Sequence, residues 1–417
     1  MEFLREVGMS VKPLTLKRKK IDVVRLNSIA DRAGGALTEL RNILLEPWPR
    51  KMAPIVSGPR VAKLSGVTLE KLNYLVKKGE IEPGTVKGNG RSREYSLAQA
   101  QAIVRKIGGK KYRSPGTGAV SISVGNFKGG VGKTTNAVAI AQGFTLRGYK
   151  VLLMDLDPQA SSTTMMGYIP DAEVPEEMTV MPAVYGEETD LRYAVQETYW
   201  HNLFFIPASP SLFGADFYLP NKQSQDPSFE FWRVLELALD PLRQEYDIIV
   251  IDTPPTLSYL AIASFMATDG LVVPVPPETL DYASSTQFFR QFAELFTKMQ
   301  EMRPIQKEFE FIKIFLSKVK ETASTTNAVR GWIRQTYPDI LGTSEVLESD
   351  VVKNASAQFK TVYDLSNYEG SARTYNRALE AFDGLVDELE EEVTAVWEAA
   401  DEGSEVSESK EPTAVPE

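Results

Sequence analysis

Short apolar runs lie through the middle of the chain, and segments with helical spacing of apolar residues separate them. The runs are Val120–Val124, Lys150–Met154, Leu203–Ile206, Ile248–Ile251, Leu271–Val275 and Phe311–Leu316. Near-continuous Val, Ile and Leu over such lengths is typical of parallel strands that are buried on both faces. Helices such as Phe229–Arg243 and Tyr282–Met299 would then cover the sheet. The pattern predicts a doubly wound, mostly parallel α/β sheet.

A different pattern precedes the sheet, between Ser57 and Ile107. Proline at the start of a helix and glycine after its end mark helix boundaries, and Gly88-Asn89-Gly90 tolerates the positive φ of a tight hairpin. The predicted elements are a helix from Pro59, a turn at Ser65–Val67, a helix from Thr68 to Lys78, strands Ile81–Lys87 and Arg91–Tyr95, and a helix at Leu97–Ile107. This order is that of a helix-turn-helix with a wing.

The two ends of the chain differ from both of these regions. Leu16–Leu45 has helical spacing interrupted at Gly34-Gly35, which predicts two helices or one broken helix. Its apolar stripe has few partners nearby, so pairing with a second copy and packing on the neighbouring domain both remain open. From about Glu388 the chain is acidic and rich in Ser and Pro, and we expect disorder. The predicted domains are an N-terminal helical segment (1–50), a winged helix-turn-helix (51–113), a nucleotide-binding domain (114–387) and a disordered acidic tail (388–417).

Charge and composition narrow the functions that are possible. The net charge of the 417 residues is −10, yet residues 1–113 hold 24 Lys and Arg against 10 Asp and Glu. An N-terminal region rich in basic residues is typical of nucleic-acid-binding proteins. A basic surface that is only solvated is the alternative. The absence of cysteine excludes disulfides, thiolate zinc sites and iron–sulfur clusters. With neither a signal pattern nor a long apolar stretch, we expect a cytoplasmic protein that does not bind membranes.

Gly132-Lys133-Thr134 follows the first predicted strand and opens the helix Asn136–Leu146. This is the context of a phosphate-binding loop, in which backbone N–H groups and a helix N-terminus surround phosphate oxygens. Lys133 would neutralise the β and γ oxygens, and the Thr134 hydroxyl would ligate Mg²⁺. The strict pattern requires glycine where Phe127 stands, and an additional lysine, Lys128, follows it.

Carboxylates end two of the apolar runs, where ligands of open α/β sheets gather. Asp155 and Asp157 lie in Asp-Leu-Asp-Pro-Gln-Ala, and Asp252 ends Asp247-Ile-Ile-Val-Ile-Asp. Asp252 is the residue type and position expected of an aspartate that holds Mg²⁺ through water. Simple solvation of a strand end is the alternative for the first pair.

Lys128-Gly-Gly-Val-Gly-Lys-Thr-Thr135 resembles the deviant phosphate loop of the ParA/MinD family at every position. Asp155–Gln159 and Asp252–Pro255 resemble that family's next two signatures. The resemblance implies ATP binding by Lys128, Gly129, Gly130, Val131, Gly132, Lys133, Thr134 and Thr135, with Pro276 beside the adenine.

The same resemblance implies a role for individual side chains. Lys128 would reach the partner's nucleotide in an ATP-sandwich dimer, Asp157 would position the attacking water, and Asp155 would lie near the magnesium. Lys128, Lys133 and Asp157 are therefore the expected catalytic residues, and Thr134, Asp155 and Asp252 the expected metal site. The implied activity is weak, Mg²⁺-dependent ATP hydrolysis.

The front domain resembles the MerR-like winged helix-turn-helix of large ParA proteins, and the whole resemblance covers roughly residues 16–385. It implies major-groove contacts from Thr68, Lys71, Asn73 and Lys77, and wing contacts from Arg91 and Arg93. A structural or protein-binding module is the alternative. Two other branches fit less well, because the C-terminus is acidic rather than a basic membrane-binding helix, and because the bridging cysteines of a nitrogenase reductase are missing.

The resemblance as a whole implies a ParA-type partition ATPase. It would form an ATP-dependent homodimer on nucleoid DNA, respond to a ParB-like centromere-binding partner, and repress its own operon by binding operator DNA. Basic residues that could serve non-specific DNA binding, or simply be solvated, are Lys318, Lys320, Arg330, Arg334, Lys353 and Lys360. The alternative function is a nucleotide-sensing transcriptional repressor without a motor role.

Overall fold

The structure is a computed structural model that describes residues 21–45, 51–87, 92–303, 305–320, 324–366 and 370–408. It divides into two units whose boundary lies at Leu44–Leu45. The first unit contains helix α2 (Val23–Leu45), which runs without a break through Gly34 and Gly35. One continuous helix thus replaces the predicted interruption, and its apolar side chains, such as Val24 and Leu40, are exposed.

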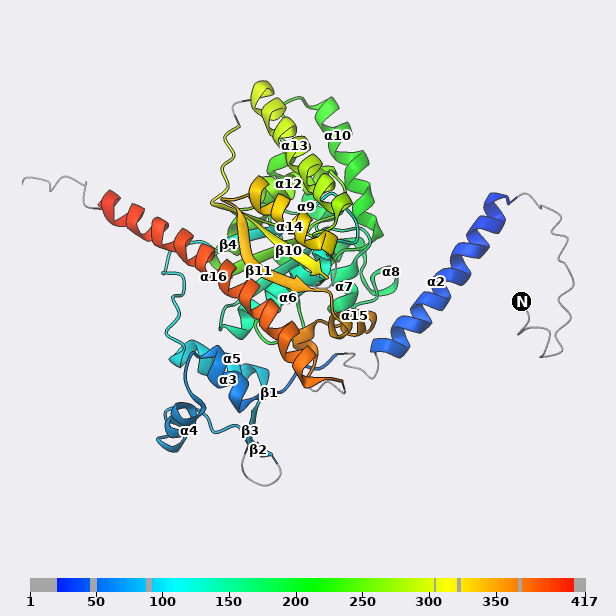
Figure 1. Cartoon of the computed structure of the whole chain (residues 1–417). Coiled ribbons are helices and arrows are strands. Elements are labelled where there is room, and N and C mark those ends of the chain that lie inside the picture. Colours follow the sequence, from blue (N-terminus) through cyan, green and yellow to red (C-terminus); the bar gives the residue numbers. More distant parts are fainter. Residues whose placement is uncertain are drawn as a thin grey trace, which may run out of the picture. The chain divides into compact units, whose positions relative to one another are not determined.

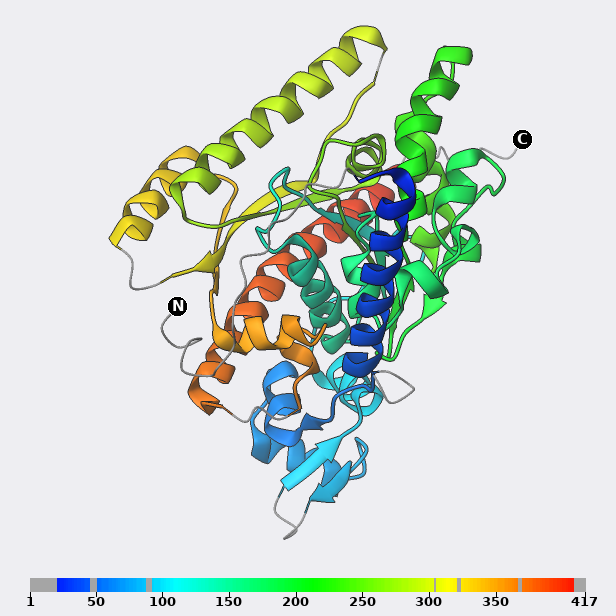
Figure 2. The same cartoon turned by 90° about the vertical axis from the view of Figure 1, so that its right-hand side faces the viewer.

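The second unit is built on an eight-stranded sheet in the order β11-β10-β9-β4-β8-β5-β7-β6 (Figures 1 and 2). All neighbours are parallel except the pair β6–β7. The strands are β4 (Val120–Val124), β5 (Val151–Asp155), β6 (Gln196–Glu197), β7 (Leu203–Ile206), β8 (Ile248–Asp252), β9 (Gly270–Val275), β10 (Phe311–Val319) and β11 (Leu341–Leu347). The predicted doubly wound sheet is confirmed. The apolar runs had marked all of these strands but β6 and β11, which are edge strands with few buried side chains.

Helices cover the sheet on both faces, and a 3₁₀ turn often extends them. The helices are α6 (Lys133–Leu146), α7 (Ser161–Met165), α8 (Pro170–Glu173), α9 (Met181–Tyr185), α10 (Ala215–Gln225), α11 (Val234–Leu239), α12 (Tyr259–Ala267), α13 (Thr279–Met302), α14 (Ser324–Thr336), α15 (Asp350–Ala357) and α16 (Ala372–Glu408). The helix predicted over 229–243 is shorter, because 3₁₀ turns at Phe231–Arg233 and Asp240–Gln244 flank α11. Pro241 has no N–H to continue an α-helical hydrogen-bond ladder.

The front module has the predicted order of helices, turn and wing. It contains α3 (Gly58–Leu64), α4 (Leu69–Lys77), α5 (Leu97–Ile107) and an antiparallel sheet of β1 (Val56–Ser57), β3 (Ser92–Tyr95) and β2 (Thr85–Lys87). Thr68 and Ser96 cap α4 and α5 with their side-chain oxygens. The predicted hairpin tip and Arg91 lie outside the described residues.

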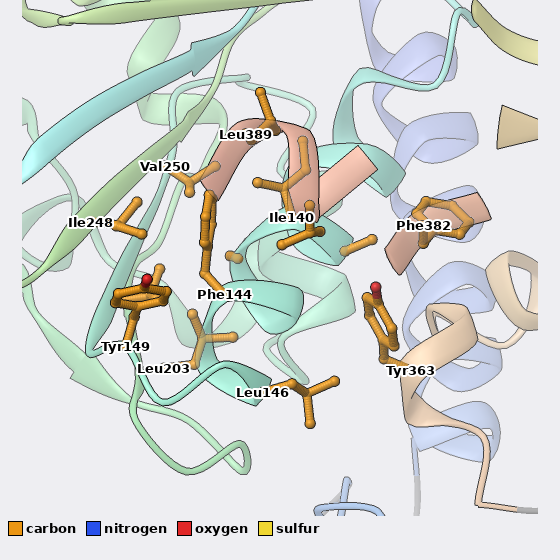
Figure 3. Close-up of a cluster of buried hydrophobic side chains, with 14 of the residues drawn as sticks. Ile140, Phe144, Leu146, Tyr149, Leu203, Ile248, Val250, Tyr363, Phe382 and Leu389 are labelled. Carbon is orange, nitrogen blue, oxygen red and sulfur yellow. The ribbon is translucent and has the colours of Figure 1, made fainter. Parts of the chain in front are cut away.

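The prediction of disorder from Glu388 onward is wrong as far as residue 408, because α16 continues to Glu408. Leu389, Val393 and Trp397 are spaced by four residues on one face of α16, and all three are fully buried. Leu389 packs in the cluster that contains Ile140 and Phe144 of α6 (Figure 3). The acidic composition had obscured this helical period. Residues 409–417 lie outside the described part of the chain.

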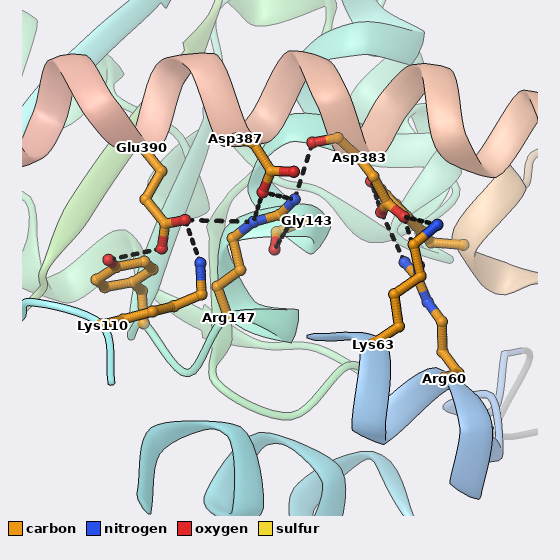
Figure 4. Close-up of polar contacts among 10 residues, drawn as sticks. Arg60, Lys63, Lys110, Gly143, Arg147, Asp383, Asp387 and Glu390 are labelled. Atoms are coloured by element: carbon orange, nitrogen blue, oxygen red, sulfur yellow. Dashed lines mark hydrogen bonds and ion pairs between the residues drawn. The ribbon is translucent and has the colours of Figure 1, made fainter. Parts of the chain in front are cut away.

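Acidic side chains of α16 also bind the front module and the linker that follows it (Figure 4). Asp383 accepts hydrogen bonds from both Nη atoms of Arg60, with 2.7 Å between Nη2 and Oδ1. Asp387 pairs with the buried Arg147 at the end of α6, and Glu390 pairs with Lys110. The front module is therefore packed against the α/β sheet domain rather than separated from it by a free linker.

Candidate nucleotide-binding site

The loop between β4 and α6 has the backbone shape of a phosphate-binding loop. Gly130 and Gly132 adopt φ values of 78° and 95°, in the left-handed region that favours glycine. A Cβ atom on Gly132 would lie 3.0 Å from the Asn136 side-chain nitrogen. Because α6 begins at Lys133, its free N–H groups and the positive end of its dipole are next to the loop. The local geometry suits a polyphosphate.

Two lysines approach this loop. Lys133 is buried and its Nζ donates to the Lys128 carbonyl at 3.1 Å. Burial lowers the pKa of Lys133, and the carboxylates of Asp252 and Asp157 oppose that shift. Lys318, on β10, donates to the Gly130 carbonyl at 2.6 Å. Its left-handed φ of 50° is unusual for a residue with a side chain and brings a second cation to the loop.

The predicted carboxylates come together at the ends of neighbouring strands. Asp155 and Asp252 are register partners on β5 and β8, and both are fully buried. Asp155 accepts from the N–H and hydroxyl of Thr163, and Asp252 accepts from the Ser162 hydroxyl at 2.7 Å. Burial raises the pKa of Asp252 to about 6 and the pKa of Asp155 well above its usual value.

Asp157 lies farther out and is only half-buried. Burial raises its pKa, while a backbone hydrogen bond from Gln159 and the charge of Lys133 oppose the shift. Asp157 thus lies in the cleft itself, whereas Asp155 and Asp252 lie behind it.

The residues around Asp252 fit a divalent cation. Its Oδ1 atom is buried and has no hydrogen-bond partner among the described residues. The Thr134 hydroxyl faces this carboxylate and helps to hold its pKa down. An unpaired carboxylate oxygen beside a threonine hydroxyl supplies the hard oxygen ligands that Mg²⁺ prefers.

A cleft of about 610 Å³ opens above the loop. Predicted residues that line it are Gly129, Gly130, Gly132, Lys133, Thr134, Thr135 and Asp157. Its opposite wall was not predicted, and it comes from β11, α15 and α16, with Val346, Ser349, Val352, Lys353, Ser356 and Phe382. Val131 and Pro276 are buried and do not line the cleft, so the role of Pro276 beside adenine stays a prediction.

The first lysine of the loop is held within its own chain. Lys128 Nζ lies 2.8 Å from Asp281 Oδ1, in the first turn of α13. Phe127, which replaces the usual glycine, packs edge-on against Phe288 with 4.6 Å between ring centroids. The large apolar side chain of Phe127 thus packs the start of the phosphate loop against α13. The reach of Lys128 to a second chain stays a prediction.

Comparison with known proteins places this site in a family. A family model described as an AAA domain matches residues 119–310. A putative replication protein A of Rhizobium rhizogenes is 30% identical over 282 residues, which cover 66% of this chain and 69% of the relative. Protein SopA of Escherichia coli K12 is 28% identical over 354 residues, or 82% of this chain and 89% of SopA. The chain belongs to the ParA family of P-loop proteins.

Solved structures agree with this ParA-family fold. One titled "Partition Protein" superposes with a TM-score of 0.55 and 22% identity, over 81% of this chain and 96% of that one. At that identity the likeness shows the fold alone. Among the described residues, no helix is both long and apolar enough to span a lipid bilayer.

The front module of this ParA-family chain presents the residues predicted to contact the major groove at α4, and Arg93 on the wing strand β3. Thr68, Lys71, Asn73 and Lys77 are all exposed, and the Thr68 hydroxyl accepts from the Lys71 N–H as the helix cap. Arg93 donates to the Pro83 carbonyl at 2.7 Å, which fixes it on the wing. These positions suit groove contacts, and DNA binding by them stays a prediction.

Several of the basic residues considered for non-specific DNA binding have acidic partners. Lys320 and Lys353 pair with Glu348, and Arg330 pairs with Glu345. Lys318 is exposed, and its Nζ donates to the Gly130 carbonyl of the phosphate loop. Local neutralisation weakens the case for Lys320, Lys353 and Arg330 as a DNA-binding surface.

Proposed function

We infer that this protein is a ParA-type partition ATPase that segregates plasmid or chromosome DNA. The observation that carries the inference is the convergence of the phosphate loop and Asp157 at one cleft, with the unpaired oxygen of the buried Asp252 behind it. The homology to SopA supports a partition role. The cleft would take ATP as substrate, with its polyphosphate along the α6 N-terminus.

The side chains divide the chemistry between them. Lys133 and Lys318 neutralise phosphate oxygens, and Asp157 orients the attacking water toward the γ-phosphorus. Thr134 and Asp252 would hold Mg²⁺, with Asp155 near it, and the ion would supply neutralisation of charge that develops on the leaving oxygens. Water attacks phosphorus, the bond to the bridging oxygen breaks, and ADP and phosphate leave. These side chains act by positioning water and neutralising charge, which is consistent with slow, Mg²⁺-dependent ATP hydrolysis.

Partner binding completes the proposed cycle. Two ATP-bound copies associate through the loop, where Lys128 meets the other copy's nucleotide, and the exposed apolar stripe of α2 provides a second contact between copies. The dimer binds nucleoid DNA without sequence preference, and a ParB-like centromere-binding protein stimulates hydrolysis and release. The front module binds operator DNA through α4 and the wing, and so represses the operon.

Measurement of Mg²⁺-dependent ATP hydrolysis, with and without duplex DNA, tests the motor role. Wild type should release phosphate above the background of Lys133→Ala, which lacks the ammonium that neutralises the phosphates. Turnover equal to that background would overturn the partition-motor function. ATP binding without turnover, together with operator binding, would instead favour the second candidate, a nucleotide-sensing repressor.

A further inference from the structure

Lys51 is a buried cation in the linker that leads into the front module. Only 8% of the residue is exposed. Its Nζ donates to the Met165 carbonyl at 2.6 Å, the Phe359 carbonyl at 2.8 Å and the Tyr199 hydroxyl at 3.0 Å. The Asp364 carboxylate lies 3.6 Å away. All three ammonium hydrogens are used, in a cage built from three separate segments of the chain.

Two segments of that cage belong directly to the nucleotide site. Met165 ends α7, the helix whose Ser162 and Thr163 hydroxyls bind Asp252 and Asp155. Phe359 closely follows α15, whose Val352, Lys353 and Ser356 line the cleft. The Lys51 ammonium therefore ties together the helix that holds the metal-site carboxylates and the helix that forms the far wall of the cleft.

The third segment reaches the phosphate-loop helix. Tyr199 donates to Asp364 and accepts from the Gln142 side chain of α6 at 3.1 Å. Thr361 donates to Gln142 through its hydroxyl, and to Asp364 through its backbone N–H. This hydrogen-bonded network connects the cage to the same helix that begins at Lys133.

The end of α15 determines the backbone conformation at the cage. Phe359 has a φ of 54°, in the left-handed region, and the N–H groups of Phe359 and Lys360 donate to the Ser356 and Ala355 carbonyls, as is typical of a helix C-terminus. That conformation is the one in which its carbonyl accepts from Lys51.

We propose that Lys51 is a positioning residue of the nucleotide site, supplied by the linker of the DNA-binding module. Four residues separate Lys51 from Val56 of β1, which pairs with the wing strand β3. A shift of α7 or α15 on nucleotide binding changes the cage, and Lys51 transfers that change to the wing. The inference rests on the proposed function, since it requires ATP in the cleft and DNA on the front module.

Reciprocity makes the proposal measurable. If Lys51 couples the two sites, ATP changes the affinity for DNA by the same factor by which DNA changes the affinity for ATP. Coupling factors of about 5 to 150 are usual for linked sites. A lysine with only a structural role would affect thermal stability and leave this factor unchanged.

The test compares full-length wild type, Lys51→Met and Tyr199→Phe, with the exposed Lys222→Met as the matched lysine control. Affinity for the duplex immediately upstream of the gene is measured by fluorescence anisotropy, without nucleotide and with saturating Mg²⁺-ATP. Wild type and Lys222→Met should change affinity at least about fivefold on ATP addition, whereas Lys51→Met should change it less than about twofold.

Tyr199→Phe removes one acceptor and keeps the ring, so it tests the cage even where Lys51→Met fails to fold. The ratio of its DNA affinities with and without ATP should fall between the ratios of wild type and Lys51→Met. The role of Lys51 would be overturned if ATP left the DNA affinity of wild type unchanged. It would also be overturned if ATP changed the DNA affinity of Lys51→Met and Tyr199→Phe as much as that of wild type. These results are distinct from failure of the proposed function, in which wild type itself shows no ATP turnover or no DNA binding.

Discussion

Lys128 Nζ lies 2.8 Å from Asp281 Oδ1, so the first lysine of the phosphate loop forms an ion pair within its own chain. The Asp281 side chain is 10% exposed, and that of Lys128 is 33% exposed. Family resemblance assigns the same lysine to the nucleotide of a second copy. Both contacts use one ammonium group, so the internal pair competes with association.

Asp281→Asn should therefore promote the ATP-dependent dimer. A partly exposed pair contributes up to about 1 kcal/mol, and a symmetric dimer breaks one pair in each copy, which corresponds to a dimer dissociation constant lower by up to about 30-fold. Sedimentation velocity with a slowly hydrolysed ATP analogue measures the shift. Lys128→Ala is the control and should abolish the analogue-dependent dimer. A weaker dimer in Asp281→Asn would show that Asp281 supports association instead of opposing it.

Asp157→Ala should separate ATP binding from hydrolysis. The carboxylate lies in the cleft and accepts its hydrogen bond from the Gln159 N–H, which is outside the phosphate loop, so ATP affinity should stay within about threefold. Loss of a group that positions and activates water lowers turnover by about 10² to 10⁴-fold. Filter binding and phosphate release measure the two quantities on one preparation, with Lys133→Ala as the variant that loses binding. Normal turnover in Asp157→Ala would remove this residue from the mechanism.

Asp252 should make the stability of the ligand-free protein depend on pH. Burial raises the pKa of Asp252 from 3.8 to about 6, so the folded state holds a proton that the unfolded state has released between those values. Its contribution to stability is greatest below pH 4 and is lost as the pH rises to 6. The loss is about 3 kcal/mol by linkage.

Urea denaturation of wild type and Asp252→Asn at about pH 4.5 and about pH 7 measures this contribution as a difference. The amide cannot titrate, so the stability of the variant should fall less between the two pH values. If the stability of both proteins fell equally between the two pH values, another group would be responsible for the pH dependence. Burial and the Asp252 charge both raise the pKa of Asp155, so Asp252→Asn also changes the titration of Asp155, and the comparison measures the contribution of the carboxylate pair.

The parts of this protein that follow local rules were predictable from sequence. Continuous apolar runs predicted the central strands, and Gly132-Lys133-Thr134 after a strand predicted the loop that Gly130 and Gly132 form with positive φ. Asp155 and Asp252 were predicted at the ends of apolar strands, where ligands of open α/β sheets gather. These features depend on residues close in sequence or on a general property of sheets.

Contacts between distant segments were not predictable in this way. Lys318 reaches Gly130 across 188 residues, and Lys51 reaches Phe359 across 308. Nothing in the composition around either lysine distinguishes it from a solvated one. The far wall of the cleft was missed for a related reason, since β11 contains polar residues at half-buried positions of an edge strand.

The C-terminal helix provides the last prediction, because its acidic composition predicted disorder and its buried side chains contradict this. Trp397 is fully buried, its ring centroid is 5.8 Å from that of Tyr149, and its Nε1 donates to the Gly118 carbonyl at 3.3 Å. Trp397→Ala should therefore lower the free energy of unfolding by about 3 to 5 kcal/mol. Glu391→Ala, a change at an exposed position of the same helix, should cost far less. Guanidinium denaturation followed by circular dichroism measures both variants. If Trp397→Ala cost under about 1 kcal/mol, residues beyond Glu388 would contribute little to the folded state, as their composition first suggested.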